Sequence, residues 1–438
     1  MFFVYNTLTL LLLPLILLGL AVALLRKKYR TRIPARLGIG LHSLHEQLPD
    51  TARAGTVWVH ALSVGEVTSA QPLLRGLRAA LPETRLVLSV ATRSGEQVAR
   101  EQLADCCHVI LAAPYDFYPV ISLFIRRIEP RVFILVETDF WPNWLHMLAW
   151  RGIPTYLVNG RISAASFARY QRFASFFAPM FRCFTGLCMQ TRADAANMAG
   201  LGLDPARIHT LGNLKFDAAG PIAGSKGGPV NKKDLRQQYG FDPTAPLLIC
   251  GSTHSGEEEL LLPAYAALLQ LVPSLQLLLA PRQIERAESI VALAKQHGIH
   301  CRRRSQTKGG SGPVLLLDTL GELAGCYAMA DLAFIGGSLV PFGGHNPVEA
   351  VAVQAAVCFG PHMDDFNEIA AELVASGGAL QIEPASIEAL KASLQQLVQD
   401  KAQRFRLTQA ANTWLESRQG VVERHLALIT PHFQQQHR

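Results

Sequence analysis

The sequence has little charge and no paired-cysteine motif. Charged residues make up 17% of the 438 positions and hydrophobic residues 49%, which excludes an intrinsically disordered chain. None of the eight cysteines forms a Cys-x-x-Cys pair, so neither a zinc site nor a small disulfide-rich scaffold is indicated. We therefore expect reduced thiols in a folded protein of about two domains.

Signatures of several enzyme classes are absent as well. The sequence contains no Walker phosphate loop, no Gly-x-Gly-x-x-Gly after the first expected strand and no Gly-x-Ser-x-Gly elbow, which argues against kinases, dehydrogenases and hydrolases. No Asp-x-Asp pair follows a strand, and Asp364 and Asp365 are adjacent rather than spaced. A catalytic metal is therefore not indicated.

The first 25 residues are typical of a membrane anchor. No charged side chain occurs from Phe2 to Leu25, and about 24 residues suffice to cross a hydrocarbon core of about 30 Å. Six basic residues follow between Arg26 and Arg36, so the positive-inside rule predicts a single-pass membrane protein with its large C-terminal part in the cytoplasm. A cleaved signal peptide is the alternative, but the segment lacks a basic start and a small-residue end.

Positive charge is concentrated in the first half of the chain. The whole chain carries a net charge of +7, and residues 26–220 contain 23 basic and 14 acidic side chains. This half is expected to meet an anionic partner, such as membrane headgroups and a lipid acceptor, and no nucleic acid is predicted.

Short apolar runs alternate with helical patterns in two series. Continuous apolar strands of this kind predict parallel sheets covered on both faces. The expected strands are 57–59, 86–90, 132–136 and 155–158 in the first series, and 247–250, 275–279, 314–317, 332–335 and 356–359 in the second.

The break between the two series predicts the domain boundaries. We expect an anchor at 1–25, a Rossmann-like domain at 26–220, a linker at 221–233 and a second Rossmann-like domain at 234–438, whose last helices could pack on the first. Ligands are expected in the cleft, at the carboxyl ends of the strands.

A phenylalanine-rich stretch, Phe173 to Phe184, has the spacing of one helix face, although Pro179 interrupts it. It is either a core-facing helix or an aromatic surface that enters the bilayer beside arginines.

Acidic residues follow two expected strands of the first domain. Glu66 comes after the strand that ends near His60, and Gly65 allows a tight turn there, so this carboxylate could accept a proton at the start of a helix. The alternative is a glutamate that only complements the helix dipole. Glu137 and Asp139 follow another strand and could orient or tune Glu66 if the two strands are neighbours.

The second half contains candidate anion and nucleotide contacts. Arg282 closes a strand and suits a phosphate, and Gly321 to Leu323 can present backbone N–H groups at a helix start. A glycine-rich loop then leads to Asn346 and to Glu349, which could reach ribose hydroxyls. Glu349 could instead close a capping box on Asn346, and His345 could be an ordinary buried histidine.

Taken together, these motifs resemble a known family from end to end. After the apolar N-terminus they occur in one order: residues 59–66 (VHALSVGE), 137–143 (ETDFWPN), 211–217 (LGNLKFD), 251–257 (GSTHSGE), 281–282 (PR) and 343–349 (GGHNPVE). The chain thus resembles the 3-deoxy-D-manno-octulosonic acid (Kdo) transferases of Gram-negative bacteria.

The resemblance implies a GT-B glycosyltransferase that transfers Kdo from CMP-Kdo to a lipid A precursor (lipid IVA) without a metal. It implies an acceptor domain first and a donor domain second, with Glu66 as general base. The implied CMP contacts are Pro281, Arg282, Gly321, Glu322, Leu323, Asn346, Pro347, Val348 and Glu349. Asp139 is shorter than the glutamate usual in the family, and the segment 363–366 departs from its pattern.

Two other functions remain open from the residues. One is a GT-B transferase that uses a UDP-sugar on a lipid acceptor, and the other is a membrane-anchored binding protein without activity.

Overall fold

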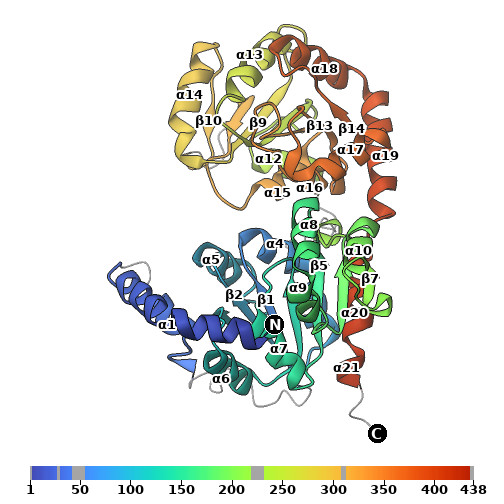
Figure 1. Cartoon of the computed structure of the whole chain (residues 1–438). Helices are drawn as coiled ribbons and strands as arrows, with labels where there is room; N and C mark the ends of the chain where they lie inside the picture. Colours follow the sequence, from blue (N-terminus) through green and yellow to red (C-terminus); the bar gives the residue numbers. More distant parts are fainter. Residues whose placement is uncertain (1, 27–29, 42–54, 219–230, 307–311, 435–438) are drawn as a thin grey trace. The chain divides into compact units, whose positions relative to one another are not determined.

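The computed structural model describes residues 2–26, 30–41, 55–218, 231–306 and 312–434. The chain divides into two compact units: unit 1 comprises residues 1–218 and 420–438, and unit 2 comprises residues 219–419. Each unit is built around its own parallel sheet (Figure 1).

Unit 1 contains a seven-stranded parallel sheet in the order β3-β2-β1-β4-β5-β6-β7. Its two faces are covered by separate apolar clusters, since Val57 and Val59 point to one cluster and Trp58 to the other. The strands are β1 Thr56–Ala61, β2 Arg85–Val90, β3 Val109–Ala112, β4 Pro130–Val136, β5 Thr155–Gly160, β6 Gly186–Met189 and β7 Ile208–Thr210.

The helices of unit 1 include the apolar N-terminal helix α1, which is the one helix among the described residues that is long and apolar enough to cross a membrane. The helices are α1 Phe2–Leu24, α2 Arg32–Arg36, α4 Val64–Ala80, α5 Arg93–Gln102, α6 Tyr118–Ile128, α7 Pro142–Trp150, α8 Ala164–Arg172, α9 Ala174–Phe181, α10 Arg192–Ala199, α11 Lys215–Ala218, α20 Val421–Ile429 and α21 Pro431–Gln434.

The C-terminal helix α20 packs on α4 of unit 1. Val421, Val422 and Ile429 belong to the same apolar cluster as β1. The Asp217 carboxylate accepts hydrogen bonds from the backbone N–H groups of Gly420 (3.0 Å) and Val422 (2.6 Å). These contacts attach the start of α20 to α11, which ends the first segment of unit 1.

Unit 2 repeats the architecture with a parallel sheet in the order β10-β11-β9-β8-β12-β13-β14. The strands are β8 Leu247–Thr253, β9 Gln276–Pro281, β10 Arg302–Arg303, β11 Val314–Leu316, β12 Leu332–Ile335, β13 Ala356–Phe359 and β14 Ala379–Gln381. The helices are α12 Lys232–Gln238, α13 Glu258–Leu269, α14 Ala287–Gln296, α15 Leu323–Cys326, α16 Val348–Ala352, α17 Asn367–Ala375, α18 Ile387–Gln399 and α19 Lys401–Glu416.

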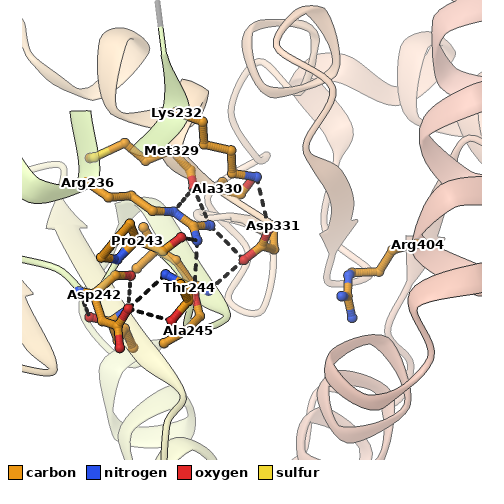
Figure 2. A network of polar contacts seen from close by, with 12 residues as sticks. Lys232, Arg236, Asp242, Pro243, Thr244, Ala245, Met329, Ala330, Asp331 and Arg404 are labelled. Atoms are coloured by element: carbon orange, nitrogen blue, oxygen red, sulfur yellow. Dashed lines mark hydrogen bonds and ion pairs between the residues drawn. The ribbon is translucent and has the colours of Figure 1, made fainter. Parts of the chain in front are cut away.

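A buried arginine fixes the first helix of unit 2 at the amino ends of two strands (Figure 2). Arg236 of α12 donates to the carbonyl oxygens of Met329 and Ala245 and pairs with Asp331 at 2.7 Å. Lys232 pairs with the same carboxylate at 2.9 Å. A buried charge is costly unless it is paired, so these bonds hold α12 at the amino ends of β8 and β12.

All nine strands expected from the apolar runs are present, and the sheets are parallel as expected. Most of the expected linker, residues 221–230, lies outside the described residues, but Lys232 and Lys233 already belong to α12.

The phenylalanine-rich stretch is divided between core and surface. Met180, Phe181 and Phe184 are buried in the core of unit 1, whereas Phe173 lies between α8 and α9 and is 51% exposed. The core interpretation therefore holds for the second half of the stretch.

Candidate functional site

The acidic residues of unit 1 meet at the point where its strand order reverses. β1 and β4 are neighbouring parallel strands, and the chain leaves them in opposite directions, towards β2 and towards β5. Glu66 follows β1 as the third residue of α4, and Glu137 and Asp139 follow β4. Ligands of open parallel sheets bind at such a switch point, so we take this edge as one candidate site.

The carboxylate of Glu66 is buried and held from both strand ends. The residue is 5% exposed; Oε2 accepts a short hydrogen bond from the Leu62 N–H, and Oε1 accepts one from the Thr138 hydroxyl at 3.4 Å. Burial raises the pKa of Glu66 to about 8, and the negative charges of Glu137 and Asp139 contribute to the shift. Such a carboxyl group is a stronger base than an ordinary glutamate.

Glu137 links this edge to more distant parts of unit 1. The residue has a positive φ of 60°, and its carboxylate accepts hydrogen bonds from Ser69 of α4 (2.9 Å) and Asn159 of β5 (3.0 Å). Asn159 in turn accepts from the Leu214 N–H at 3.0 Å. The segment 211–217 is thereby tied to the candidate site.

Asp139 pairs with the buried His60 of β1. The distance between Asp139 Oδ2 and His60 Nε2 is 2.8 Å. Burial would raise the pKa of Asp139, but the hydrogen bond and charge of His60 and a bond from Trp141 outweigh it and hold this pKa below its usual value. Asp139 therefore stays ionised where Glu66 does not.

The nucleotide contacts expected in unit 2 gather at the carboxyl edge of its sheet. Pro281 ends β9 and Arg282 follows it, Gly321 follows β11, and the loop with Asn346 follows β12. These three strands and β8 are adjacent in the sheet. The Arg282 N–H donates to the Thr253 carbonyl oxygen at 2.9 Å, and its side chain is exposed.

A fully buried carboxylate holds two loops of this edge together. Glu257 accepts hydrogen bonds from the backbone N–H groups of Gly337 (2.6 Å), Ser338 (2.9 Å), Leu339 (2.9 Å) and His254 (2.8 Å). The loop after β8 and the loop after β12 are thus joined at the switch point of unit 2.

Two histidines also lie at this switch point. His254 Nε2 and His345 Nε2 are 2.8 Å apart, and the His254 ring stacks on Phe342 with centroids 4.3 Å apart. Burial, followed by the positive charge of Arg282, lowers the pKa of His254, and burial together with His254 and Arg282 lowers that of His345 to about 4. His345 is half-buried and has a specific partner, so it is not an ordinary core histidine.

The remaining residues expected to contact CMP differ in burial and in the partners that their side chains already have. The Glu322 carboxylate already binds Arg304 at 2.9 Å and Tyr239 at 2.9 Å, so its side chain is held by protein partners. Asn346 Oδ1 accepts from the N–H of Val348, the first residue of α16, at 3.2 Å. Val348 is buried, whereas Glu349 is half-buried.

Sequence reasoning assigned no role to His60, Ser69, Asn159, His254 and Glu257. Some of these residues, or residues that contact them, lie in the motifs 251–257 and 211–217. Their partners depend on the strand order, which the sequence alone does not give. Among the described residues, no group of three His, Cys, Asp or Glu side chains is arranged to hold a metal ion.

Sequence comparisons show strong similarity to one family. A family model described as 3-deoxy-D-manno-octulosonic-acid transferase matches residues 31–218. The 3-deoxy-D-manno-octulosonic acid transferase of Haemophilus influenzae is 32% identical over 437 residues, which cover 99% of both chains. That of Bordetella pertussis is 33% identical over 85% of this chain and 86% of its own.

Solved structures with the same fold have low sequence identity. A glycosyltransferase from Rickettsia africae has a TM-score of 0.56 at 11% identity and covers 87% of this chain and 99% of its own. A UDP-GlcNAc 2-epimerase from Neisseria meningitidis has a TM-score of 0.58 at 12% identity and covers 83% and 99%. Two parallel Rossmann-like sheets of this kind form a GT-B-like fold.

Proposed function

Because the chain belongs to the family of 3-deoxy-D-manno-octulosonic acid transferases of lipopolysaccharide core biosynthesis, we propose that it transfers Kdo from CMP-Kdo to the lipid A precursor lipid IVA and releases CMP. The structural observation that supports a mechanism is the buried Glu66 at the switch point of unit 1, with its pKa raised to about 8.

Glu66 is proposed as the general base. Its carboxylate takes the proton of an acceptor hydroxyl while that oxygen attacks the anomeric carbon of Kdo. The bond from this carbon to the phosphate oxygen breaks, and CMP leaves with the bonding electrons. Attack opposite the leaving group inverts the anomeric configuration.

Unit 2 is proposed to bind the donor. Arg282 and the backbone near Gly321 would stabilise the charge that develops on the departing CMP phosphate, so the proposed reaction needs no metal. Pro281, Glu322, Leu323, Asn346, Pro347, Val348 and Glu349 complete the proposed CMP contacts, with Glu322 and Val348 acting through their backbone.

The proposed location is the inner membrane, with both units on its cytoplasmic side and the basic residues 26–36 near anionic headgroups. The length and apolar composition of α1 support a single-pass crossing.

The proposal is tested by incubating the full-length protein with CMP-Kdo and tetraacylated lipid A precursor. Mass spectrometry is expected to show the precursor with added Kdo, together with released CMP. Inhibition by CMP but not by UDP is expected. No release of CMP would indicate a binding protein, and inhibition by UDP alone would indicate a UDP-sugar transferase.

A further inference from the structure

We propose that His254 and His345 of unit 2 bind the carboxylate of the donor sugar, so that the protein selects a sugar acid over a neutral sugar. This inference rests on the proposed function, because it assigns one chemical group of CMP-Kdo to two side chains. Neither histidine is among the residues expected to contact CMP, and the proposed mechanism gives neither a role.

The two histidines lie between the proposed phosphate contact and other proposed contacts of the nucleotide. His254 directly follows β8, and His345 lies in the loop that follows β12. On one side of β8, β9 leads to Arg282; on the other side, the loop after β12 continues to Asn346. A ligand that reaches from Arg282 to Asn346 along this edge therefore passes the histidine pair.

Backbone contacts fix the two loops that carry the histidines. The Glu257 carboxylate accepts backbone N–H groups of both loops, including that of His254 at 2.8 Å. Gly336 packs so closely on the carbonyl group of Ser252 that an added Cβ would clash. Ser252 has a positive φ of 56°, and strained backbone of this kind is typical of functional sites. The backbone of each histidine is therefore in place before a ligand binds.

The rings meet edge to edge and leave one nitrogen of each ring open. The two Nε2 atoms are 2.8 Å apart, and the ring planes differ by 12°. A Cβ added to Gly337 would lie 3.3 Å from Cδ2 of His345 and 3.4 Å from Cδ2 of His254, so both rings turn Nδ1 away from Gly337. Among the described residues, neither Nδ1 atom has a hydrogen-bond partner and neither is fully enclosed. Both are available to a ligand.

Both histidines are neutral at pH 7, and this determines what the pair can offer. Burial and the charge of Arg282 lower the pKa of His254, and burial, His254 and Arg282 lower the pKa of His345 to about 4. Of the two Nε2 atoms that face each other, one must carry the hydrogen and the other must accept it. Because a neutral imidazole has one N–H group, the pair then presents one Nδ1–H donor and one Nδ1 acceptor.

One donor beside one acceptor matches a sugar acid. Kdo carries its carboxylate on the anomeric carbon, which in CMP-Kdo also bears the phosphate, and its sugar ring carries hydroxyl groups. The Nδ1–H group donates to the carboxylate, and the other Nδ1 accepts from a hydroxyl. A phosphate diester has only acceptor oxygens, so it would face the lone pair of the second Nδ1 unfavourably. A neutral sugar has no anionic group for the Nδ1–H donor.

Arg282 supplies the positive charge that the neutral pair lacks. Its side chain is exposed, and within the part of the chain that the structure describes its guanidinium has no ion-pair or hydrogen-bond partner. Its effect on the pKa of both histidines places its charge near them. Since the donor bears two anionic groups on one carbon, the guanidinium takes the phosphate and the histidine pair takes the carboxylate.

The first test replaces His254 in the full-length protein in two ways. His254→Phe keeps an aromatic ring against Phe342 but removes both nitrogen atoms, whereas His254→Asn keeps a hydrogen-bonding group near the position of Nδ1 but loses the ring. Loss of a hydrogen bond to a charged group should lower kcat/KM for CMP-Kdo by about 10- to 150-fold in His254→Phe. His254→Asn is expected to retain clearly more activity. The reverse order would mean that the ring only supports the loop, and it would overturn the proposal.

CMP binding separates the carboxylate from the phosphate. Calorimetric titration with CMP should give the affinity of the unsubstituted chain for His254→Phe and also for His345→Phe, which repeats the test from the other loop. His300→Phe, at an exposed position beyond α14, is the matched control and should change neither CMP affinity nor kcat/KM. If CMP affinity falls as far as kcat/KM in the variants of the pair, the histidines serve the nucleotide and the assignment is wrong.

The last measurement uses a donor analogue in which the carboxylate is converted to a carboxamide. The unsubstituted chain is expected to bind this analogue, measured by its inhibition of transfer, about 10- to 150-fold more weakly than CMP-Kdo. In His345→Phe the difference between the two donors should shrink to about threefold or less. An undiminished difference would contradict the assignment, whereas failure of the proposed function would appear as absence of Kdo transfer by the unsubstituted chain itself.

Discussion

The two units share a sheet topology but differ in the chemistry of their switch points. At the edge of unit 1, Glu66 accepts one backbone N–H and lies near two other carboxylates. At the edge of unit 2, the buried Glu257 accepts four backbone N–H groups, and the side chains left open are Arg282 and a histidine pair. One scaffold thus presents a buried carboxylate at the switch point of one unit and an exposed arginine at that of the other.

The comparison also separates two kinds of buried carboxylate. Glu257 positions loops, because its oxygens are fully used by backbone donors. Glu66 keeps an oxygen that only the Thr138 hydroxyl approaches, at 3.4 Å. Four substitutions test whether this division between a structural and a reactive carboxylate, and between base and anion site, is correct.

The largest effect is expected from Glu66→Gln. A glutamine has nearly the same shape but cannot take a proton, so transfer should fall by about 10²- to 10⁴-fold. CMP binding, measured by calorimetry, should remain unchanged because the proposed donor contacts lie in unit 2. Glu83→Gln, at an exposed position of unit 1, serves as the control, and retained turnover in Glu66→Gln would remove this residue from its role.

Arg282→Ala tests the proposed phosphate contact of unit 2. Loss of a charge-assisted hydrogen bond to phosphate costs about 1.5–3 kcal/mol, so CMP affinity should drop roughly 10- to 150-fold. Lys295→Ala removes an exposed positive charge from α14 of the same unit and should change affinity little. Equal calorimetric titrations of the two variants would show that general charge, rather than Arg282 itself, attracts the nucleotide.

Glu257→Gln is expected to act on stability rather than on chemistry. The amide NH₂ would face backbone N–H donors, which lowers the free energy of unfolding of unit 2 by about 1–3 kcal/mol. Hydrogen exchange followed by mass spectrometry should show faster exchange at residues 337–339 and no change in unit 1. Faster exchange in Glu66→Gln than in Glu257→Gln would reverse the proposed distinction between the two carboxylates.

Strand patterns predicted most of the fold because buried parallel strands are continuously apolar. Five strands were not expected, since they are short and lie towards the edges of the two sheets: β3, β6, β7, β10 and β14. The position of Glu66 after a strand and at the start of a helix was predictable, because a glycine and a strand end mark it, whereas its role as a base stays a prediction. The partners of Glu66 were not identifiable, because Thr138 and Asn159 meet it or its neighbours only through strand order.

The docking of α1 shows a second limit of the sequence. Apolar length and flanking charge predict a membrane helix, but they carry no information on tertiary contacts such as the bond between Asn6 and Asn143. Composition therefore identifies the solvent that a helix prefers but not the side chains that its first turn contacts.

The smallest expected effect is on the pH profile, and it tests the tuning of Glu66 directly. The base must be deprotonated, so kcat/KM should fall about tenfold per pH unit below the Glu66 pKa of about 8. Glu137→Gln removes a neighbouring negative charge while keeping an acceptor oxygen for Ser69 and Asn159. Without that charge the ionised form of Glu66 is less disfavoured, and the acidic limb should move to lower pH by up to about one unit. Glu129→Gln, at an exposed position just before β4, should leave the limb in place. A limb that stays fixed or moves to higher pH in Glu137→Gln would mean that the charge of Glu137 does not raise the pKa of Glu66.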